Sequence, residues 1–186
     1  MENNRSLLKE SLKEGGVILY PTDTIWGLGC DATKDEACER ILELKERKEG
    51  KSFIVLVDSV RMLEQYVPDF PEVCYDLIDL ATEPLTIIYP GVQGLAKSVY
   101  AEDGSVGIRV VNHGLCQELI RALRKPIVST SANISGAAIP TTFSEIDQRL
   151  VDGVDGVSSE SHGEVQKRAS KIIKIGLDSQ IQIIRN

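Results

Sequence analysis

The residues of this chain that could carry chemistry are cations and small polar side chains, and no histidine-based triad accompanies them. Four cations, Lys45, Arg47, Lys48 and Lys51, fall within seven residues. Guanidinium and ammonium groups at this spacing can surround the oxygens of a polyphosphate, because both form charge-assisted hydrogen bonds to anions. The same pattern is typical of a helix C-terminus on a solvated face, where cations complement the helix dipole. The residue types alone leave both interpretations open.

A further cation, Arg109, lies inside the apolar segment Ser105-Val-Gly-Ile-Arg-Val. Burying an unpaired charge is costly, and a planar guanidinium matches a carboxylate. We therefore expect Arg109 either to bind a carboxylate or to point to solvent. The segment from Ser129 to Gly136, with Asn133 within it, follows an expected short strand. It is either a ligand-binding loop at a strand end or a turn held by its own side chains.

Two nucleotide-binding patterns in the chain are incomplete. Gly50-Lys51-Ser52 resembles the end of a P-loop, but residue 45 is Lys and the segment leads into a predicted strand, so we reject it. Gly27-Leu-Gly29-Cys-Asp-Ala32 fits a dinucleotide-binding spacing, but residues 21–26 separate it from the preceding strand. We predict a tight turn before a helix there and keep an NAD(H)-dependent oxidoreductase as an alternative.

The elements that must position these residues alternate between helices and strands. One helix is expected to end at Gly15, with Leu7, Leu8, Ser11 and Leu12 on its buried face. A capping box at Thr33–Glu36 should open a second helix, Pro71 should begin a third, and residues 115–123 should form a fourth. Strands are expected over residues 17–20 (stopped by Pro21), 53–57, 85–89, 106–111, 126–129, 154–157, 171–175 and 181–184. This order predicts a single α/β domain over residues 1–186 with a mixed sheet.

The composition is that of an ordinary globular protein. The chain has 186 residues, 42% of them hydrophobic, and a formal net charge of −7. It can therefore bury a core, and its acidity argues against a protein that coats nucleic acid along its whole surface. No apolar run approaches the ~20 residues of a membrane span, and no signal peptide is evident, so we expect a cytoplasmic protein. The four cysteines lack metal-ligand spacing, so we expect reduced, half-buried thiols and no protein-bound metal.

Taken in order, these segments resemble the YrdC-like family of threonylcarbamoyl-AMP synthases over roughly residues 5–186. The stretch from Gly16 to Leu28 resembles the family's opening motif, Lys45-x-Arg47 its K-x-R motif and Ser131-x-Asn133 its S-x-N motif. The middle and closing blocks are Pro84-Leu-Thr86, Pro90-Gly91, Ser105 to Arg109, and Ile184-Arg185. Two positions depart from the pattern: Lys48 stands where Pro is usual, and Lys171 follows Ser170 where Thr is usual.

The resemblance implies an open, twisted, mixed α/β sheet with flanking helices around a concave basic cavity. It implies condensation of L-threonine, bicarbonate and ATP to threonylcarbamoyl-AMP and pyrophosphate. A separate transferase would then carry the threonylcarbamoyl group to adenosine 37 of tRNAs that read ANN codons. Mg²⁺ should bind through the ATP phosphates, and no organic cofactor or membrane is implied. A weak contact with tRNA is compatible with the resemblance.

The resemblance also assigns site residues by matched position. The residues assigned to threonine are Thr24, Leu56, Arg109, Ser129 and Ser170. The residues assigned to ATP are Lys45, Arg47, Lys51, Ser105, Ser131, Asn133, Ile139 and Arg185. Within the second set, Lys45, Arg47 and Lys51 are expected to act on the triphosphate as the catalytic cations.

Two further functions stay open besides the oxidoreductase. A non-catalytic RNA-binding module would use the cations of residues 45–51 on phosphates, and it predicts salt-dependent RNA affinity without nucleotide turnover. A carbamoyl-adenylate-forming relative would use carbamoyl phosphate in place of threonine. Both make predictions that a pyrophosphate-release assay separates.

Overall fold

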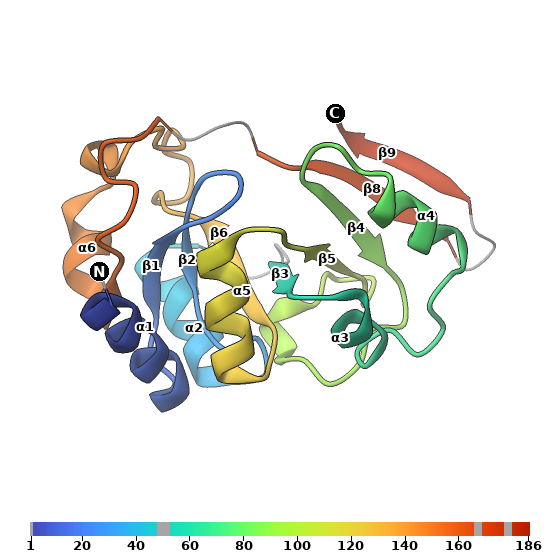
Figure 1. Ribbon diagram of the computed structural model, residues 1–186, viewed down its shortest axis with the longest axis horizontal. Helices are drawn as coiled ribbons and strands as arrows, with labels where there is room; N and C mark the ends of the chain where they lie inside the picture. Colours follow the sequence, from blue (N-terminus) through green and yellow to red (C-terminus); the bar gives the residue numbers. More distant parts are fainter. Residues whose placement is uncertain (1, 48–52, 166–168, 177–179) are drawn as a thin grey trace.

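A nine-stranded mixed sheet runs through the molecule in the order β7-β1-β2-β6-β3-β5-β4-β8-β9 (Figure 1). The computed structural model describes residues 2–47, 53–165, 169–176 and 180–186. Its strands are β1 (Ile18–Pro21), β2 (Trp26–Gly29), β3 (Ile54–Val57), β4 (Leu85–Tyr89), β5 (Val106–Val110), β6 (Ile127–Ser131), β7 (Gly156–Val157), β8 (Lys171–Ile175) and β9 (Ile181–Arg185). Its helices are α1 (Glu2–Glu14), α2 (Asp35–Leu44), α3 (Val60–Glu64), α4 (Val73–Asp79), α5 (Gly114–Leu123) and α6 (Gln148–Gly153), with 3-10 turns η1 (Lys97–Val99) and η2 (Phe143–Glu145).

The strand pairing confirms the predicted mixed sheet. The pairs β1/β7, β3/β5 and β4/β8 are parallel, and the other neighbouring pairs are antiparallel. At the centre, Ile54 of β3 lies beside Ser129 of β6 and Gly107 of β5, and Leu56 lies beside Arg109. Because side chains alternate along a strand, this register places Ile54, Leu56, Arg109 and Ser129 on one face of the sheet.

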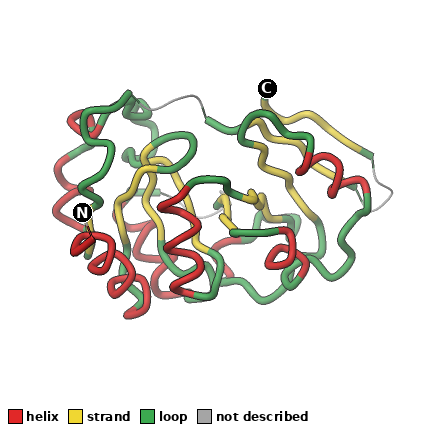
Figure 2. Tube along the Cα trace, viewed as in Figure 1, coloured by secondary structure: helices red, strands yellow, loops and turns green. Residues whose placement is uncertain are grey.

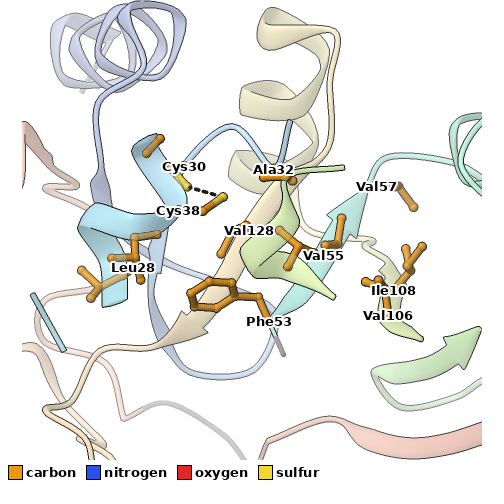
Figure 3. Packing of buried hydrophobic residues seen from close by; sticks show 14 of the residues in the cluster. Leu28, Cys30, Ala32, Cys38, Phe53, Val55, Val57, Val106, Ile108 and Val128 are labelled. Carbon is orange, nitrogen blue, oxygen red and sulfur yellow. Dashed lines mark hydrogen bonds between the residues drawn. The ribbon is translucent and has the colours of Figure 1, made fainter. Parts of the chain in front are cut away.

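Each face of the sheet has its own apolar core. Helices α1 and α5 pack side by side on the face that carries Leu56, and their Leu8, Leu12, Leu115 and Leu119 lie in that core. The opposite face packs against α2 in a larger core, which contains Phe53, Val55 and Val57 together with Ile108, Cys30 and Cys38 (Figure 3). Helices and loops thus cover the sheet along its flanks (Figure 2), but α1 and α5 cover only part of the Arg109 face.

Strand β2 replaces the turn that was predicted around Gly27–Ala32. A Cβ at Gly29 would lie 2.6 Å from Tyr20 Cε1 and 2.8 Å from the Val128 carbonyl oxygen. Glycine is therefore required by close packing between β1 and β6, and the pattern marks a strand in the sheet. Pro21 does not stop β1 before it but forms its last residue, opposite Trp26.

Three helix predictions also change in detail. The capping box at Thr33 is wrong: α2 starts after Lys34 without a side-chain cap, and the Thr33 hydroxyl donates instead to Asp31 Oδ1 at 2.7 Å. On α1, Leu8, Ser11 and Leu12 are buried as expected, but Leu7 is 47% exposed. Helices α3 and α6 were not predicted, because each is about one or two turns long. No described helix is long and apolar enough to cross a membrane.

The cysteines are all free and, in contrast to the expectation of half-burial, all buried. Cys30 and Cys38 lie side by side, with their sulfurs 3.7 Å apart (Figure 3). The hydrogen bond to Cys38 and burial both raise the pKa of the Cys30 thiol. Among the described residues, no group of three His, Cys, Asp or Glu side chains is arranged to hold a metal ion.

Candidate active site

A cavity of about 210 Å³ lies over the centre of the sheet, beside the part of the face that α1 and α5 cover. Its lining combines three arginines with five hydroxyl side chains and a few small or apolar residues. The lining residues are Thr24, Ile25, Gly27, Arg47, Ile54, Arg109, Ser129, Thr130, Ser131, Ile139, Ala169, Ser170 and Arg185. None of these described lining residues is Asp or Glu, so the lining itself offers guanidinium and hydroxyl groups to a ligand.

Gly27 lets the β1–β2 loop approach the opposite wall of this cavity. A Cβ at this position would lie 3.2 Å from Ser129 Oγ and 3.3 Å from the Thr130 carbonyl oxygen. A larger residue would push these groups away, because such contacts are tighter than ordinary packing allows. Gly27 thus keeps Ser129 close to the loop that carries Thr24.

Arg109 is the most deeply buried cation of the cavity. It is 3% exposed, and its Nη2 donates to Asp23 Oδ1 at 2.9 Å and to Thr24 Oγ1 at 3.4 Å. Its Nε is buried without a hydrogen-bond partner among the described residues. The structure therefore excludes a solvent-facing Arg109 and leaves the guanidinium with donor capacity for another anion.

Hydrogen bonds within the β1–β2 loop fix the position of Thr24. The Thr22 hydroxyl donates to the Ile25 carbonyl at 2.8 Å and lies 2.9 Å from Thr24 Oγ1. The same Thr22 oxygen accepts from the backbone N–H groups of Thr24 and Ile25, at 3.1 and 3.2 Å. This is the local side-chain to backbone bonding that Thr favours in turns, and it holds residues 22–25 against Arg109.

Arg47 lies just beyond the end of α2 and reaches the cavity beside β3 and β6. Its guanidinium lies 5.2 Å from the centre of the Phe53 ring, and Nη1 lies 3.4 Å from Thr130 Oγ1. Burial lowers the pKa of Arg47, although it remains a cation at any ordinary pH. A partly desolvated guanidinium of this kind binds phosphate oxygens more strongly than an exposed one does.

Lys45 does not line the cavity. It is 3% exposed, and its Nζ donates to the main-chain carbonyls of Ser131 and, at 2.7 Å, Asn133. Burial, with a smaller contribution from the charge of Arg47, lowers the pKa of Lys45 to about 8. Lys45 therefore holds the loop after β6 in place without lining the cavity itself.

The polar atoms of the Asn133 side chain are hydrogen-bonded within the same loop. Its Oδ1 accepts from Ser131 Oγ at 2.5 Å, and its Nδ2 donates to the carbonyls of Ile134 and Ala137 at 3.1 and 2.8 Å. Ser131 lines the cavity, but Asn133 does not. Of the two interpretations of this segment, the self-bonded turn holds for Asn133, while Ser129 and Ser131 face the cavity.

The C-terminal strands close the cavity on the side of β4. Arg185 of β9 donates from Nε to the Ser170 carbonyl at 2.9 Å and lies 3.3 Å from Ser170 Oγ through Nη2. Ser170 Oγ lies 2.8 Å from Thr86 Oγ1 of β4, which is fully buried. Burial, followed by the nearby charge of Arg109, lowers the pKa of Arg185. Arg109 and Arg185 are thus close enough to repel one another, which favours an anionic ligand between them.

The structure brings together eight of the residues assigned from the sequence, and four other described ones, Lys45, Leu56, Ser105 and Asn133, do not line the cavity. The eight that line it are Thr24, Arg47, Arg109, Ser129, Ser131, Ile139, Ser170 and Arg185. Leu56 is fully buried beside Arg109 in the α1–α5 core, and the Ser105 hydroxyl bonds Asp103 Oδ1 at 2.6 Å in its own turn. Lys51 lies outside the described residues.

Sequence reasoning missed Asp23, Thr86 and Thr130. For Thr86, a polar residue inside the otherwise apolar segment Leu85–Tyr89 was the available signal, whereas Asp23 lies between two threonines of the opening motif and had no such signal. Their partners are 86 and 84 residues away, however, and no local pattern reports such pairing. Thr130 follows Ser129 in the loop segment and reaches the cavity because β6 ends there.

Both the sequence and the fold of the chain have known relatives. Residues 10–186 match the protein family Sua5_yciO_yrdC, described as "Telomere recombination". The chain is 37% identical to a Pseudomonas aeruginosa protein named threonylcarbamoyl-AMP synthase. The alignment of 147 residues covers 78% of this chain and 79% of that relative.

Two solved structures share the fold. A variant of P. abyssi Sua5 has a TM-score of 0.85 at 25% identity, over 94% of this chain but 53% of that one, so the chain spans about half the length of that Sua5. E. coli YciO has a TM-score of 0.83 at 25% identity, over 98% of this chain and 89% of that one. On the match over residues 10–186 and the identity to its curated relative, the chain belongs to the Sua5/YciO/YrdC family.

Proposed function

We propose that this chain is a threonylcarbamoyl-AMP synthase, which condenses L-threonine, bicarbonate and ATP to threonylcarbamoyl-AMP and pyrophosphate. The observation that carries the proposal is the buried Arg109 guanidinium in a cavity that also presents Arg47 and Arg185. One buried cation suits an amino-acid carboxylate, and two further cations suit the phosphates of ATP. The name of the P. aeruginosa relative supports the same activity.

The amino acid would lie with its carboxylate on Arg109. Thr24, Ser129 and Ser170 line the same cavity, and we assign their hydroxyls to its polar groups. Leu56 lies beside Arg109 in the sheet without reaching the cavity. We therefore assign it to packing against the Arg109 side chain and not to contact with threonine. This arrangement gives threonine one charge-assisted anchor and several neutral hydrogen bonds.

The nucleotide would lie toward Arg47 and Arg185, with Ser131 and the half-exposed Ile139 beside it. Lys45 and Asn133 act as positioning residues, because their bonds hold the loop that carries Ser131. The assignment of Lys51 to the triphosphate stays a prediction from the sequence. Ser105 does not line the cavity and has no part in this proposal.

The chemistry asks little of a protein acid or base. The threonine amine, after its ammonium form has lost a proton to solvent, attacks bicarbonate, and loss of water gives a carbamate anion. A carbamate oxygen then attacks the α-phosphorus while the bond to the pyrophosphate oxygen breaks. Holding the reactants in line and compensating their charge accounts for most of the catalysis in such displacements. Fixed arginines and hydroxyls fit that requirement, and the described lining residues include no histidine.

Mg²⁺ is expected to arrive with ATP. Mg²⁺ prefers oxygen ligands and is commonly held by substrate phosphates, and the described cavity lining contains no carboxylate. We therefore propose that phosphate oxygens and water hold the ion, which would supply charge compensation on the triphosphate. Arg47 and Arg185 would hold the phosphates themselves.

Pyrophosphate release tests the proposal. The complete mixture of ATP, Mg²⁺, L-threonine and bicarbonate should release pyrophosphate, and omitting threonine or bicarbonate should abolish the release. Replacing threonine by carbamoyl phosphate should not restore it. Release that ignores threonine, or that needs carbamoyl phosphate, would contradict the substrate assignment, and RNA binding without any release would favour the RNA-binding module.

Two wider expectations follow from this activity. The adenylate is labile, so we propose that it passes to a separate threonylcarbamoyl transferase that modifies position 37 of tRNA. We also propose that the protein works in the cytoplasm, where that tRNA is found. Weak direct binding of tRNA would be compatible with this role.

A further inference from the structure

Asp23 is the carboxylate that touches the cavity's central cation, and the proposed function gives it no task. Its Oδ1 accepts from Arg109 Nη2 at 2.9 Å, and the two side chains are 15% and 4% exposed. Asp23 also lines neighbouring cavities of about 500 and 750 Å³, the second of which shares Ala169 with the cavity of Arg109. Asp23 therefore lies between the candidate amino-acid site and these two neighbouring cavities.

Thr24, next to Asp23, presents an acceptor to Arg109. The Thr22 hydroxyl has one hydrogen, and its shorter contact, at 2.8 Å, is to the Ile25 carbonyl. The 2.9 Å contact between the two threonine hydroxyls then uses the Thr24 hydrogen. Thr24 Oγ1 is left with lone pairs, one of which faces Arg109 Nη2 at 3.4 Å.

The group around Arg109 is thus a donor flanked by two acceptors. Arg109 can only donate, and both Asp23 and Thr24 accept from it. A zwitterionic α-amino acid has the complementary arrangement, since its carboxylate accepts and its ammonium donates one carbon away. Arg109 Nε, which has no hydrogen-bond partner among the described residues, is a further donor on the same guanidinium. A ligand carboxylate on Arg109 therefore brings its α-ammonium within reach of Asp23, which already lies 2.9 Å from the same guanidinium.

We infer that Asp23 binds the α-ammonium group of the amino-acid substrate and selects α-amino acids over acids that lack the amine. The inference rests on the proposed function. The Asp23–Arg109 pair is neutral, so zwitterionic threonine adds no net charge to the site. A plain carboxylic acid of the same shape adds an uncompensated negative charge beside Asp23, and like charges at this distance repel.

Calorimetric titration of two ligands tests the inference. The ligands are L-threonine and 3-hydroxybutanoate, which keeps the carboxylate and the hydroxyl but lacks the amine, each with and without a non-hydrolysable ATP analogue and Mg²⁺. Asp23→Asn should weaken threonine binding by roughly tenfold or more, the usual range for one hydrogen bond to a charged group. Binding of 3-hydroxybutanoate should stay unchanged or become tighter.

Asp58→Asn is the matched control. Asp58 lines the same 500 Å³ cavity, has the same 15% exposure and forms an ion pair with an arginine, Arg121. Unlike Asp23, it forms no ion pair with Arg109 among the described residues. This variant should leave both affinities unchanged. Thermal melting of each variant, followed by circular dichroism, checks that it is folded.

The opposing outcomes are distinct. Equal weakening of both ligands in folded Asp23→Asn would mean that Asp23 only supports Arg109 and would overturn the inference. Tighter binding of threonine would mean that Asp23 competes for Arg109 and would overturn it as well. If the unaltered protein does not bind threonine at all, with or without the ATP analogue, the proposed function fails, and the inference fails with it.

Discussion

At Arg109, deep burial and incomplete pairing occur in one side chain. The guanidinium is 3% exposed, and both of its described contacts use Nη2. Burying a cation away from water costs free energy unless its N–H donors form hydrogen bonds to acceptors. The Asp23 carboxylate supplies part of this compensation, and a ligand carboxylate would supply the remainder.

Arg109→Ala should therefore weaken threonine binding far more than ATP binding. A charge-assisted bond to a carboxylate contributes about 1.5–3 kcal/mol, so the threonine Kd should rise by about 10- to 100-fold. Isothermal titration with threonine and with an ATP analogue measures both. Arg121→Ala, which removes an arginine paired with Asp58 and 62% exposed, is the control. Equal losses for both ligands in Arg109→Ala would remove Arg109 from the amino-acid site.

Lys45 gives a pH-dependent prediction at the same scale. Burial and Arg47 lower its pKa from 10.5 to about 8, so between these values the unfolded chain holds a proton that the folded chain has lost. The free energy of unfolding should therefore rise with pH from about 8 to about 10, relative to Lys45→Met, by roughly 1 kcal/mol per pH unit.

Urea unfolding of both proteins across this pH range measures the difference. Lys13→Met, which changes an exposed lysine of α1, should follow the unaltered protein. Parallel profiles for Lys45→Met and the unaltered protein would show that burial does not perturb Lys45 in this way.

Local patterns predicted individual residues to different degrees. An arginine inside an apolar strand indicated an anion partner, and Arg109 has one in Asp23. The cation cluster at residues 45–51 suggested a phosphate clamp, yet the Lys45 ammonium is bound to carbonyls 86 and 88 residues away. That contact depends on where β6 ends relative to α2, and no spacing within the cluster encodes it.

At the scale of elements, strand β2 decides the shape of the site. It joins β1 to β6 and brings the Thr24 loop against Ser129. Its Gly-Leu-Gly sequence lacks the β-branched residues that usually mark a strand, which is why its pattern suggested a turn. The largely apolar segment Leu85–Tyr89, interrupted only by Thr86, was predicted correctly as a strand, because a short apolar run of this length is typical of a mostly buried strand.

Gly29→Ala should destabilise the sheet at this point. The added methyl group would meet Tyr20 Cε1 at 2.6 Å and the Val128 carbonyl at 2.8 Å, and overpacking of this kind costs about 1–3 kcal/mol. Gly114→Ala is the matched control, because a Cβ there meets nothing within 4 Å and α5 begins at this residue. It should be neutral or stabilise by up to about 1 kcal/mol. Urea unfolding compares the two, and equal stabilities would argue against tight packing at Gly29.

At the scale of the whole molecule, the sheet gathers cations that lie far apart in an acidic chain. The formal net charge is −7, yet Arg47, Arg109 and Arg185 reach one cavity from the end of α2, from β5 and from β9. The distribution suits small anions better than extended nucleic acid. The order of motifs along the chain predicted the fold and eight of the cavity residues, whereas contacts such as Asp23 with Arg109 emerge only when distant strands pair.

Detection of the product itself tests the proposed synthase activity most directly. Purified protein is mixed with ATP, Mg²⁺, L-threonine and isotopically labelled bicarbonate, and the quenched reaction is analysed at once by mass spectrometry. We expect a labelled threonylcarbamoyl adduct of AMP that depends on threonine and is strongly reduced in Arg109→Ala. Absence of the adduct from the unaltered protein, or its formation at an equal rate in Arg109→Ala, would contradict the proposed activity.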